Sequence, residues 1–169
     1  MIYNPTKNDV RSFWFNIYNK QKNQEQLSDL ENIAINIINM HPEFNYIFIA
    51  QNLYLNYIWQ DNSMHNLSHD KNNNPFLHLS MHLTIAEQLN IAKMQYNNQE
   101  NNNINNTIIF NQNNMHLLHE QILQQSHDYH AGVHKIILAF TTMINHSYKY
   151  NHGLNIDIYI DNLQKLLLQ

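Results

Sequence analysis

The sequence has 169 residues, of which 43% are hydrophobic and only 13% are charged, and its formal net charge is −4. This length and apolar content suit one domain with a buried core. Nine Lys and Arg residues supply no basic field for a phosphate backbone, so nucleic acid is not an expected partner. Twelve His residues outnumber Lys and Arg together, and this excess has direct chemical consequences.

The chain contains no cysteine, which removes disulfides, thiolate metal sites and thiol nucleophiles from consideration. Its first five residues, MIYNP, lack the basic and apolar regions of a signal peptide. No apolar run approaches the roughly 20 residues that span a bilayer. We therefore expect a soluble cytoplasmic protein with no membrane partner.

Apolar periodicity and capping residues predict six or so helices, and hairpin signals are missing. The first two helices begin at Thr6 and Ser28, each with an acidic residue three positions later. Pro42 ends the second helix, and Pro75 opens the central one. The first expected helix fades near residues 20–23, the second ends at 40–41, and a short one follows through residue 50. The central helix ends somewhere in 90–95, the pattern is helical again from residue 115, a further helix stops at 151–153, and the last covers 156–168.

Two polar segments interrupt this pattern. Residues 61–74 form an expected loop, and we interpret its two histidines, His65 and His69, as solvated. Residues 96–114 are rich in Asn and predict a low-complexity, exposed insertion with at most a short ordered piece at 107–110. The sequence as a whole predicts an all-α fold, a single helical bundle over residues 1–169.

The central helix carries two histidines on the face that should be buried. At about 100° per residue, His78 and His82 align with Ile85 and Leu89. Glu87 falls on the opposite side. The periodicity therefore places both imidazoles in the core.

A second pair with the same spacing, His130 and His134, lies at one edge of a later apolar stripe. Ser126 is the expected N-cap of that helix. His127 is adjacent to the same edge and could be an additional ligand or lie next to one.

Two His-x-x-x-His pairs on inward or boundary faces predict a metal site. Residues four apart share a helix face, so both imidazoles of a pair can reach one ion. Imidazole suits zinc and iron, and we expect one of these at a mononuclear site held by His78, His82, His130 and His134. Glu31 could add a carboxylate, or its side chain could only complete the cap at Ser28. An open position would accept water or a small ligand.

The alternative is a non-enzymatic interaction or structural domain. Its core histidines would then be neutral and hydrogen-bonded to Thr84, Thr141, Glu31 or backbone carbonyls. Nucleophilic serine motifs and phosphate-binding loops are not recognisable, and Gly occurs only twice. Whether the protein is an enzyme stays open at this point.

One known pattern appears in the segments NPT at 4–6, VRSFWF at 10–15, LE at 30–31, INMHPEF at 38–44, NPFLHLSMHLTIAEQL at 74–89 and HDYHAGVH at 127–134. Together these segments resemble the domain of unknown function 1841 family of small proteobacterial proteins. The resemblance implies a mostly bacterial, soluble setting and names no reaction. The chain departs from the family pattern where the Asn-rich segment from about Tyr96 replaces a compact Gln-Pro-Pro-Gly turn, and where Ala131 replaces an acidic residue.

Overall fold

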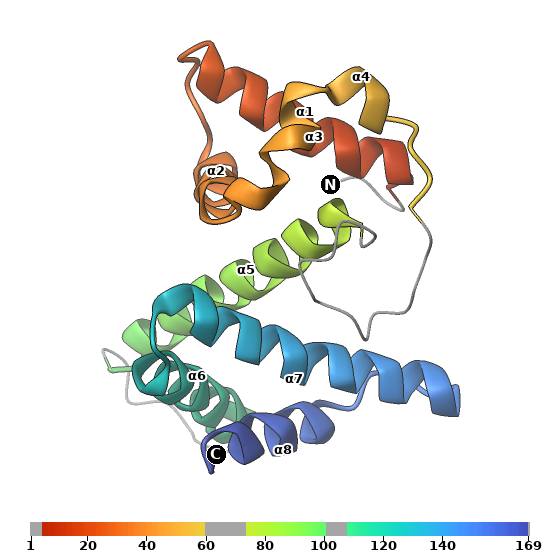
Figure 1. The fold of residues 1–169 in the computed structure, drawn as a ribbon. Coiled ribbons are helices and arrows are strands. Elements are labelled where there is room, and N and C mark those ends of the chain that lie inside the picture. The colour runs from red at the N-terminus through yellow and green to blue at the C-terminus, as the bar shows by residue number, and fades with distance from the viewer. Residues whose placement is uncertain (1–4, 60–73, 101–107, 169) are drawn as a thin grey trace. The chain divides into compact units, whose positions relative to one another are not determined.

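The computed structural model describes residues 5–59, 74–100 and 108–168, and within these ranges the protein is helical without strands (Figure 1). The predicted all-α class is confirmed. None of the described helices is long and apolar enough to cross a membrane. The elements are α1 (Lys7–Lys22), α2 (Asp29–Met40), the 3-10 helix η1 (Pro42–Phe44), α3 (Asn45–Ile49), α4 (Gln51–Tyr54), α5 (Pro75–Glu100), α6 (Ile108–Gln125), α7 (Tyr129–Tyr150) and α8 (Ile156–Leu166).

Capping residues fix most of the helix starts as predicted. Thr6 and Ser28 are the N-caps of α1 and α2, and each forms a complete capping box. The predicted cap of α7 is wrong. Asp128 holds that position, and its carboxylate accepts a hydrogen bond from the backbone N–H of Ala131 at 2.7 Å. The Ser126 hydroxyl instead donates to the Ile122 carbonyl oxygen in the last turn of α6.

Helices α5 and α6 extend further into the Asn-rich segment than its composition predicted. Helix α5 continues to Glu100, and α6 already begins at Ile108. Asparagine is only a weak helix former, so continuation from an established helix is the physical reason for this extension. Residues 101–107 lie outside the described residues, as do residues 60–73 with the expected loop and its His65 and His69.

The chain divides into two compact units, Met1–Leu83 and Thr84–Gln169, which we call unit 1 and unit 2. The division falls inside α5. Each unit is described by itself below, and the single domain over residues 1–169 stays a prediction.

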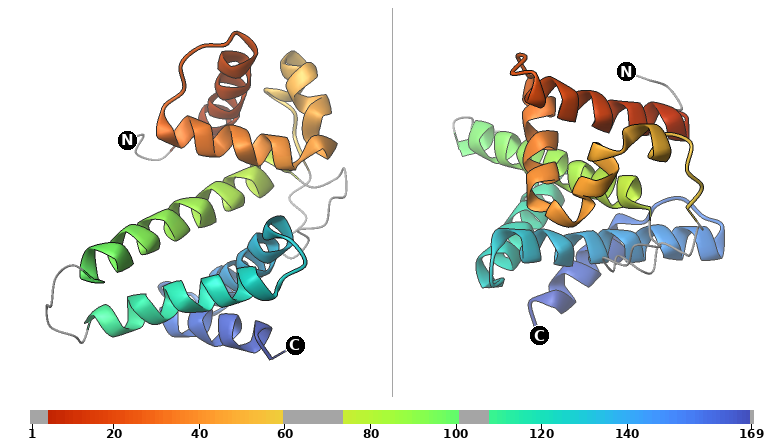
Figure 2. Two further views of the ribbon diagram at one scale, coloured as in Figure 1. Left: turned by 90° about the vertical axis from the view of Figure 1, so that its left-hand side faces the viewer. Right: turned by 45° about the horizontal axis from the view of Figure 1, so that its top comes forward.

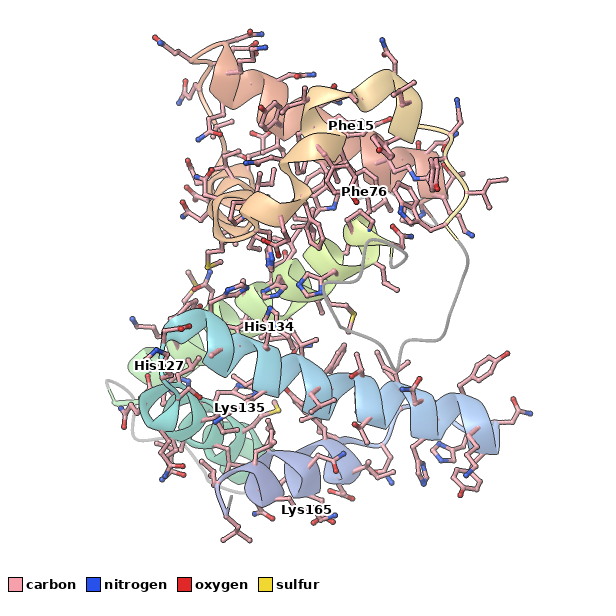
Figure 3. The ribbon with its side chains drawn as sticks, viewed as in Figure 1. Phe15, Phe76, His127, His134, Lys135 and Lys165 are labelled. Atoms are coloured by element: carbon pink, nitrogen blue, oxygen red, sulfur yellow. The ribbon has the colours of Figure 1, made fainter. Side chains whose placement is uncertain are left out.

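Aromatic side chains form the core of unit 1. Phe15 of α1 meets Phe76 of α5 edge-to-face at 5.3 Å between ring centroids, and both are labelled in Figure 3. Phe48 of α3 meets Phe15 in the same way at 6.1 Å. Burial of each such ring contributes on the order of 2 kcal/mol, with about 1 kcal/mol more from edge-to-face contact. These contacts fix α1, α3 and the start of α5 within unit 1.

A buried arginine ties the segment after α4 to α1. Arg11 is 6% exposed, and its Nη1 and Nη2 donate to the carbonyl oxygens of Leu55 and Tyr57 at 2.5 and 2.8 Å. Its guanidinium carbon also lies 4.9 Å from the ring centroid of Trp59. The planar, multi-donor head of arginine can satisfy two carbonyls and stack on an indole at once, and lysine cannot.

Unit 2 contains the part of α5 from Thr84 onwards together with α6, α7 and α8, and these last three helices pack against one another in both views of Figure 2. Its buried side chains include Ile122, Ile136, Tyr159 and Leu163. Gly132 of α7 lies close to Leu123 of α6. A methyl group at this position would lie 2.9 Å from Leu123 Cδ2 and 3.1 Å from Leu123 Cα.

Replacing Gly132 with alanine is expected to destabilise unit 2 by about 1 kcal/mol. Overpacking of the added methyl group against Leu123 lowers the free energy of unfolding by about 1–3 kcal/mol. The higher helix propensity of alanine offsets up to about 1 kcal/mol of this loss. The Leu123 side chain can rotate, but its Cα can move only with α6. Gly153→Ala is the matched control, because nothing lies within 4 Å of an added methyl group there. Urea unfolding followed by circular dichroism measures both, and equal midpoints would contradict the close approach.

Candidate metal centre

The predicted burial of the central histidines is confirmed. Pro75 is the first residue of α5, and the Asn74 side chain accepts a hydrogen bond from the Phe76 N–H at 3.1 Å, so the helix starts just before both imidazoles. His78 is 7% exposed and His82 is 1% exposed. One helical turn separates them, and their ring centroids lie 4.8 Å apart.

A third imidazole joins this pair in unit 1, and the sequence did not identify it. His41 is completely buried, and its ring centroid lies 4.7 Å from that of His78 and 4.5 Å from that of His82. A ring nitrogen of His41 lies within 4.8 Å of one of His82. The available signal was the position of His41 at the end of an apolar helix, because the following Pro42 forces it out of helical geometry.

A carboxylate orients the His41 ring. Nδ1 of His41 lies 2.9 Å from Oε1 of Glu43, two residues along the chain. The ionised carboxylate only accepts, so Nδ1 carries the proton, and in the neutral ring the lone pair is on Nε2. Metal-binding histidines in proteins commonly have this arrangement, with one nitrogen bonded to a carboxylate and the other directed at the ion.

The second predicted pair lies on α7 in unit 2. The ring centroids of His130 and His134 are 4.4 Å apart, and a ring nitrogen of one lies within 4.8 Å of one of the other. Both side chains are half-buried, in agreement with the boundary position expected from the sequence. Figure 3 shows His134 and Lys135 on opposite sides of α7. His127 is exposed and precedes the helix.

Glu31 takes the capping position. One carboxylate oxygen accepts from the Ser28 backbone N–H at 2.8 Å, and the other lies 2.6 Å from Lys20 Nζ. The hydrogen bond from Lys20 and those from Ser28 lower the pKa of Glu31 to about 2. The sequence left two roles open for Glu31, a carboxylate at the metal site or a part of the cap at Ser28. In the structure its side chain completes the capping box. Its oxygens are directed at Ser28 and Lys20 and do not contribute to the histidine cluster of unit 1.

The comparison with protein families covers nearly the whole chain. Residues 6–165 match the family described as "Domain of unknown function (DUF1841)". The chain belongs to this family. No curated protein and no solved structure matches it.

This DUF1841 chain also has a hydrogen-bonded histidine in unit 2, which the sequence did not single out. His119 of α6 is 1% exposed, and its Nε2 lies 2.8 Å from the Tyr159 hydroxyl of α8. Burial, together with the nearby His116, lowers the pKa of His119 to about 4, and burial raises the pKa of Tyr159. His119 is therefore neutral at pH 7 and joins α6 to α8 through a buried hydrogen bond.

The three rings in unit 1 have a spacing that suits one metal ion. Metal–nitrogen bonds of about 2.0–2.1 Å place imidazole centroids on one ion about 4.5–5.2 Å apart, for bond angles between 90° and tetrahedral. The observed separations are 4.7, 4.5 and 4.8 Å. The rings are also steeply inclined to one another, at 90°, 70° and 50°. The centroid distances of the three rings therefore match those expected for imidazoles bound to one ion.

Proposed function

We propose that this protein binds a transition-metal ion, zinc or iron, through the imidazoles of His41, His78 and His82. The spacing of the three buried rings within unit 1 carries the proposal. Nitrogen donors of this kind favour zinc, iron, nickel and copper over magnesium and calcium.

Three imidazoles leave a coordination position for water or a small ligand. A metal ion of this kind lowers the pKa of bound water or polarises a bound carbonyl, which would permit hydrolysis or small-molecule redox chemistry. Glu43 would hold the His41 ring in the tautomer that presents Nε2. The proposal is a metal-binding role in the cytoplasm, and the reaction class is left to substrate profiling of the metal-loaded protein.

The sequence-based hypothesis also includes His130 and His134 as ligands, and this part of it stays a prediction. Within unit 2 they form a pair with ligand-like spacing, and two imidazoles are too few for a zinc site on their own. The metal content of the His130→Gln, His134→Gln double variant decides their contribution.

The alternative function is a structural or interaction domain with a buried histidine network. One observation favours it, the His119–Tyr159 hydrogen bond, which shows that this chain uses a buried neutral histidine to connect helices. If the unit 1 histidines have the same role, their replacement changes stability and leaves the metal content unchanged.

Elemental analysis of protein purified without a polyhistidine tag tests the proposal. The wild type is expected to contain close to one metal ion per chain, and His82→Leu is expected to lose it. Glu43→Gln keeps a hydrogen-bonding side chain but removes the charge, so metal affinity should fall by about 10–100-fold. His127→Gln is the matched control, an exposed histidine outside the cluster.

Protein that remains metal-free after incubation with zinc, iron and manganese would exclude the proposal. Thermal melting of His82→Leu separates the two functions further. A metal-binding role predicts loss of metal with a retained or even higher melting temperature, because an apolar side chain fits the buried site. A structural network predicts a large loss of stability without any change in metal content.

A further inference from the structure

The C-terminal end of α7 folds back on itself and brings two histidines together. Asn151 adopts a left-handed conformation with φ 51° and ψ 46°. The N–H of His152 then bonds to the Ser147 carbonyl at 3.1 Å, and that of Asn151 to the Tyr148 carbonyl at 3.3 Å. This pair of bonds closes the helix in a Schellman motif. The turn directs His152 back towards the last turn of α7, where His146 lies.

The two imidazoles meet through their nitrogens. Nε2 of His152 lies 3.0 Å from Nδ1 of His146. Nδ1 of His152 lies 2.6 Å from the Gly153 carbonyl oxygen, which can only accept, so this nitrogen carries the proton. In neutral His152 the lone pair is therefore on Nε2 and faces His146. A backbone carbonyl that fixes the tautomer in this way is typical of metal-binding histidines.

The distance between the nitrogens distinguishes among metals. With metal–nitrogen bonds of about 2.0–2.1 Å, a separation of 3.0 Å corresponds to a bond angle of roughly 95° at the ion. A tetrahedral zinc ion would need about 3.3 Å. Near-right angles are typical of tetragonal copper(II) and of nickel(II).

The position is open to solvent. His152 is exposed and His146 half-buried. His152 borders a surface groove, so an ion and its remaining water ligands can reach this ring from solvent. The residues that line this groove are Ile144, Ser147, Tyr148, Asn151, His152 and Leu154.

We propose that His146 and His152 form a surface site for copper(II) or nickel(II), separate from the candidate metal centre of unit 1. The ion takes the place of the proton on Nδ1 of His146, and that proton moves to Nε2 of the same neutral ring as it changes tautomer. Two imidazoles complete half of a tetragonal coordination sphere, and water supplies the rest. The order of affinity is expected to be copper(II) above nickel(II) above zinc(II), from both the bond angle and the intrinsic preference of nitrogen ligands.

Titration of the full-length, tag-free chain with copper(II) tests this site. Isothermal titration calorimetry is expected to show a copper(II) site, distinct from any ion at the candidate metal centre of unit 1, whose affinity falls at least tenfold in His146→Gln and in His152→Gln. His127→Gln, which changes an exposed histidine without a ring partner, should bind as the wild type does. Electron paramagnetic resonance of the copper-bound chain should show coupling to two nitrogens, and His152→Gln should reduce it to one.

A second pair of variants tests the turn without touching a ligand. Asn151→Gly retains the left-handed conformation and should keep copper(II) binding, whereas Asn151→Val opposes it and should weaken binding. Unchanged calorimetry in both histidine variants would overturn the proposal and leave an ordinary hydrogen bond between the rings. Copper binding that disappears only in His41→Gln or His82→Leu would overturn it as well, by assigning the ion to unit 1.

Discussion

Arg11→Met is expected to lower the free energy of unfolding of unit 1 by about 3 kcal/mol. The substitution keeps most of the side-chain volume but removes both donors to the carbonyls of Leu55 and Tyr57. Each acceptor left without a partner costs about 1–3 kcal/mol, and the contact of the cation with the Trp59 ring is lost as well. Burial lowers the pKa of Arg11, but arginine remains charged at all ordinary pH values.

Urea unfolding followed by tryptophan fluorescence measures this loss, because both tryptophans of the chain, Trp14 and Trp59, belong to unit 1. Lys22→Met is the matched control, since it removes an exposed cation from the same helix and should change stability by less than about 0.5 kcal/mol. Arg11→Lys should recover only part of the loss, because an ammonium cannot bond to both carbonyls and stack on the indole. Equal midpoints for the two methionine variants would contradict the anchoring role of Arg11.

Acid is expected to destabilise unit 2 through His119, by about 3 kcal/mol in total. The pKa of His119 is lowered from 6.5 to about 4 in the folded protein, so the unfolded chain takes up the proton first. The contribution of this group to stability is complete above pH 6.5 and falls as the pH drops from 6.5 towards 4. Its Nδ1 is buried without a hydrogen-bond partner among the described residues, so a proton there would be desolvated and unsatisfied.

The unfolding free energy at pH 7 and pH 4.5, followed by circular dichroism, measures this slope. His119→Gln does not titrate, and its amide can still bond to the Tyr159 hydroxyl, so this variant should lose about 2–3 kcal/mol less than the wild type over the same range. His127→Gln removes an exposed histidine and should retain the acid sensitivity of the wild type. If His119→Gln lost as much unfolding free energy between pH 7 and pH 4.5 as the wild type, the acid sensitivity would come from other groups.

Proposed metal binding and the acid sensitivity of His119 are independent features of this protein. His41, with Glu43 on its Nδ1, has the environment of a ligand. His119, which is buried and has a tyrosine hydroxyl on one nitrogen, has the environment of a neutral structural residue. Buried histidines in one chain thus differ in chemistry according to the group that bonds to each ring, and the metal content and the pH profile are expected to respond to different variants.

The sequence by itself determined the helices and the burial of the central histidines. Helix starts depend on interactions within three or four residues, so the capping boxes that begin at Thr6 and Ser28 can be predicted from the sequence. The burial of His78 and His82 follows from the angular period of a single helix. The capping role of Glu31 is equally local, and it was one of the two alternatives that the sequence left open.

Only the tertiary structure decided which side chains from distant segments meet. The contact of His41 with His82 joins residues 41 positions apart, and no local period relates them. The bond between His119 and Tyr159 spans 40 positions, and those from Arg11 to the carbonyls after α4 span 44 and 46. These contacts arise because helices bury their apolar faces together, and the polar groups on those faces must then find partners on whichever helix they meet. Helix formation is a local property and can be predicted from residues alone, whereas the choice of partner is a property of the packed core.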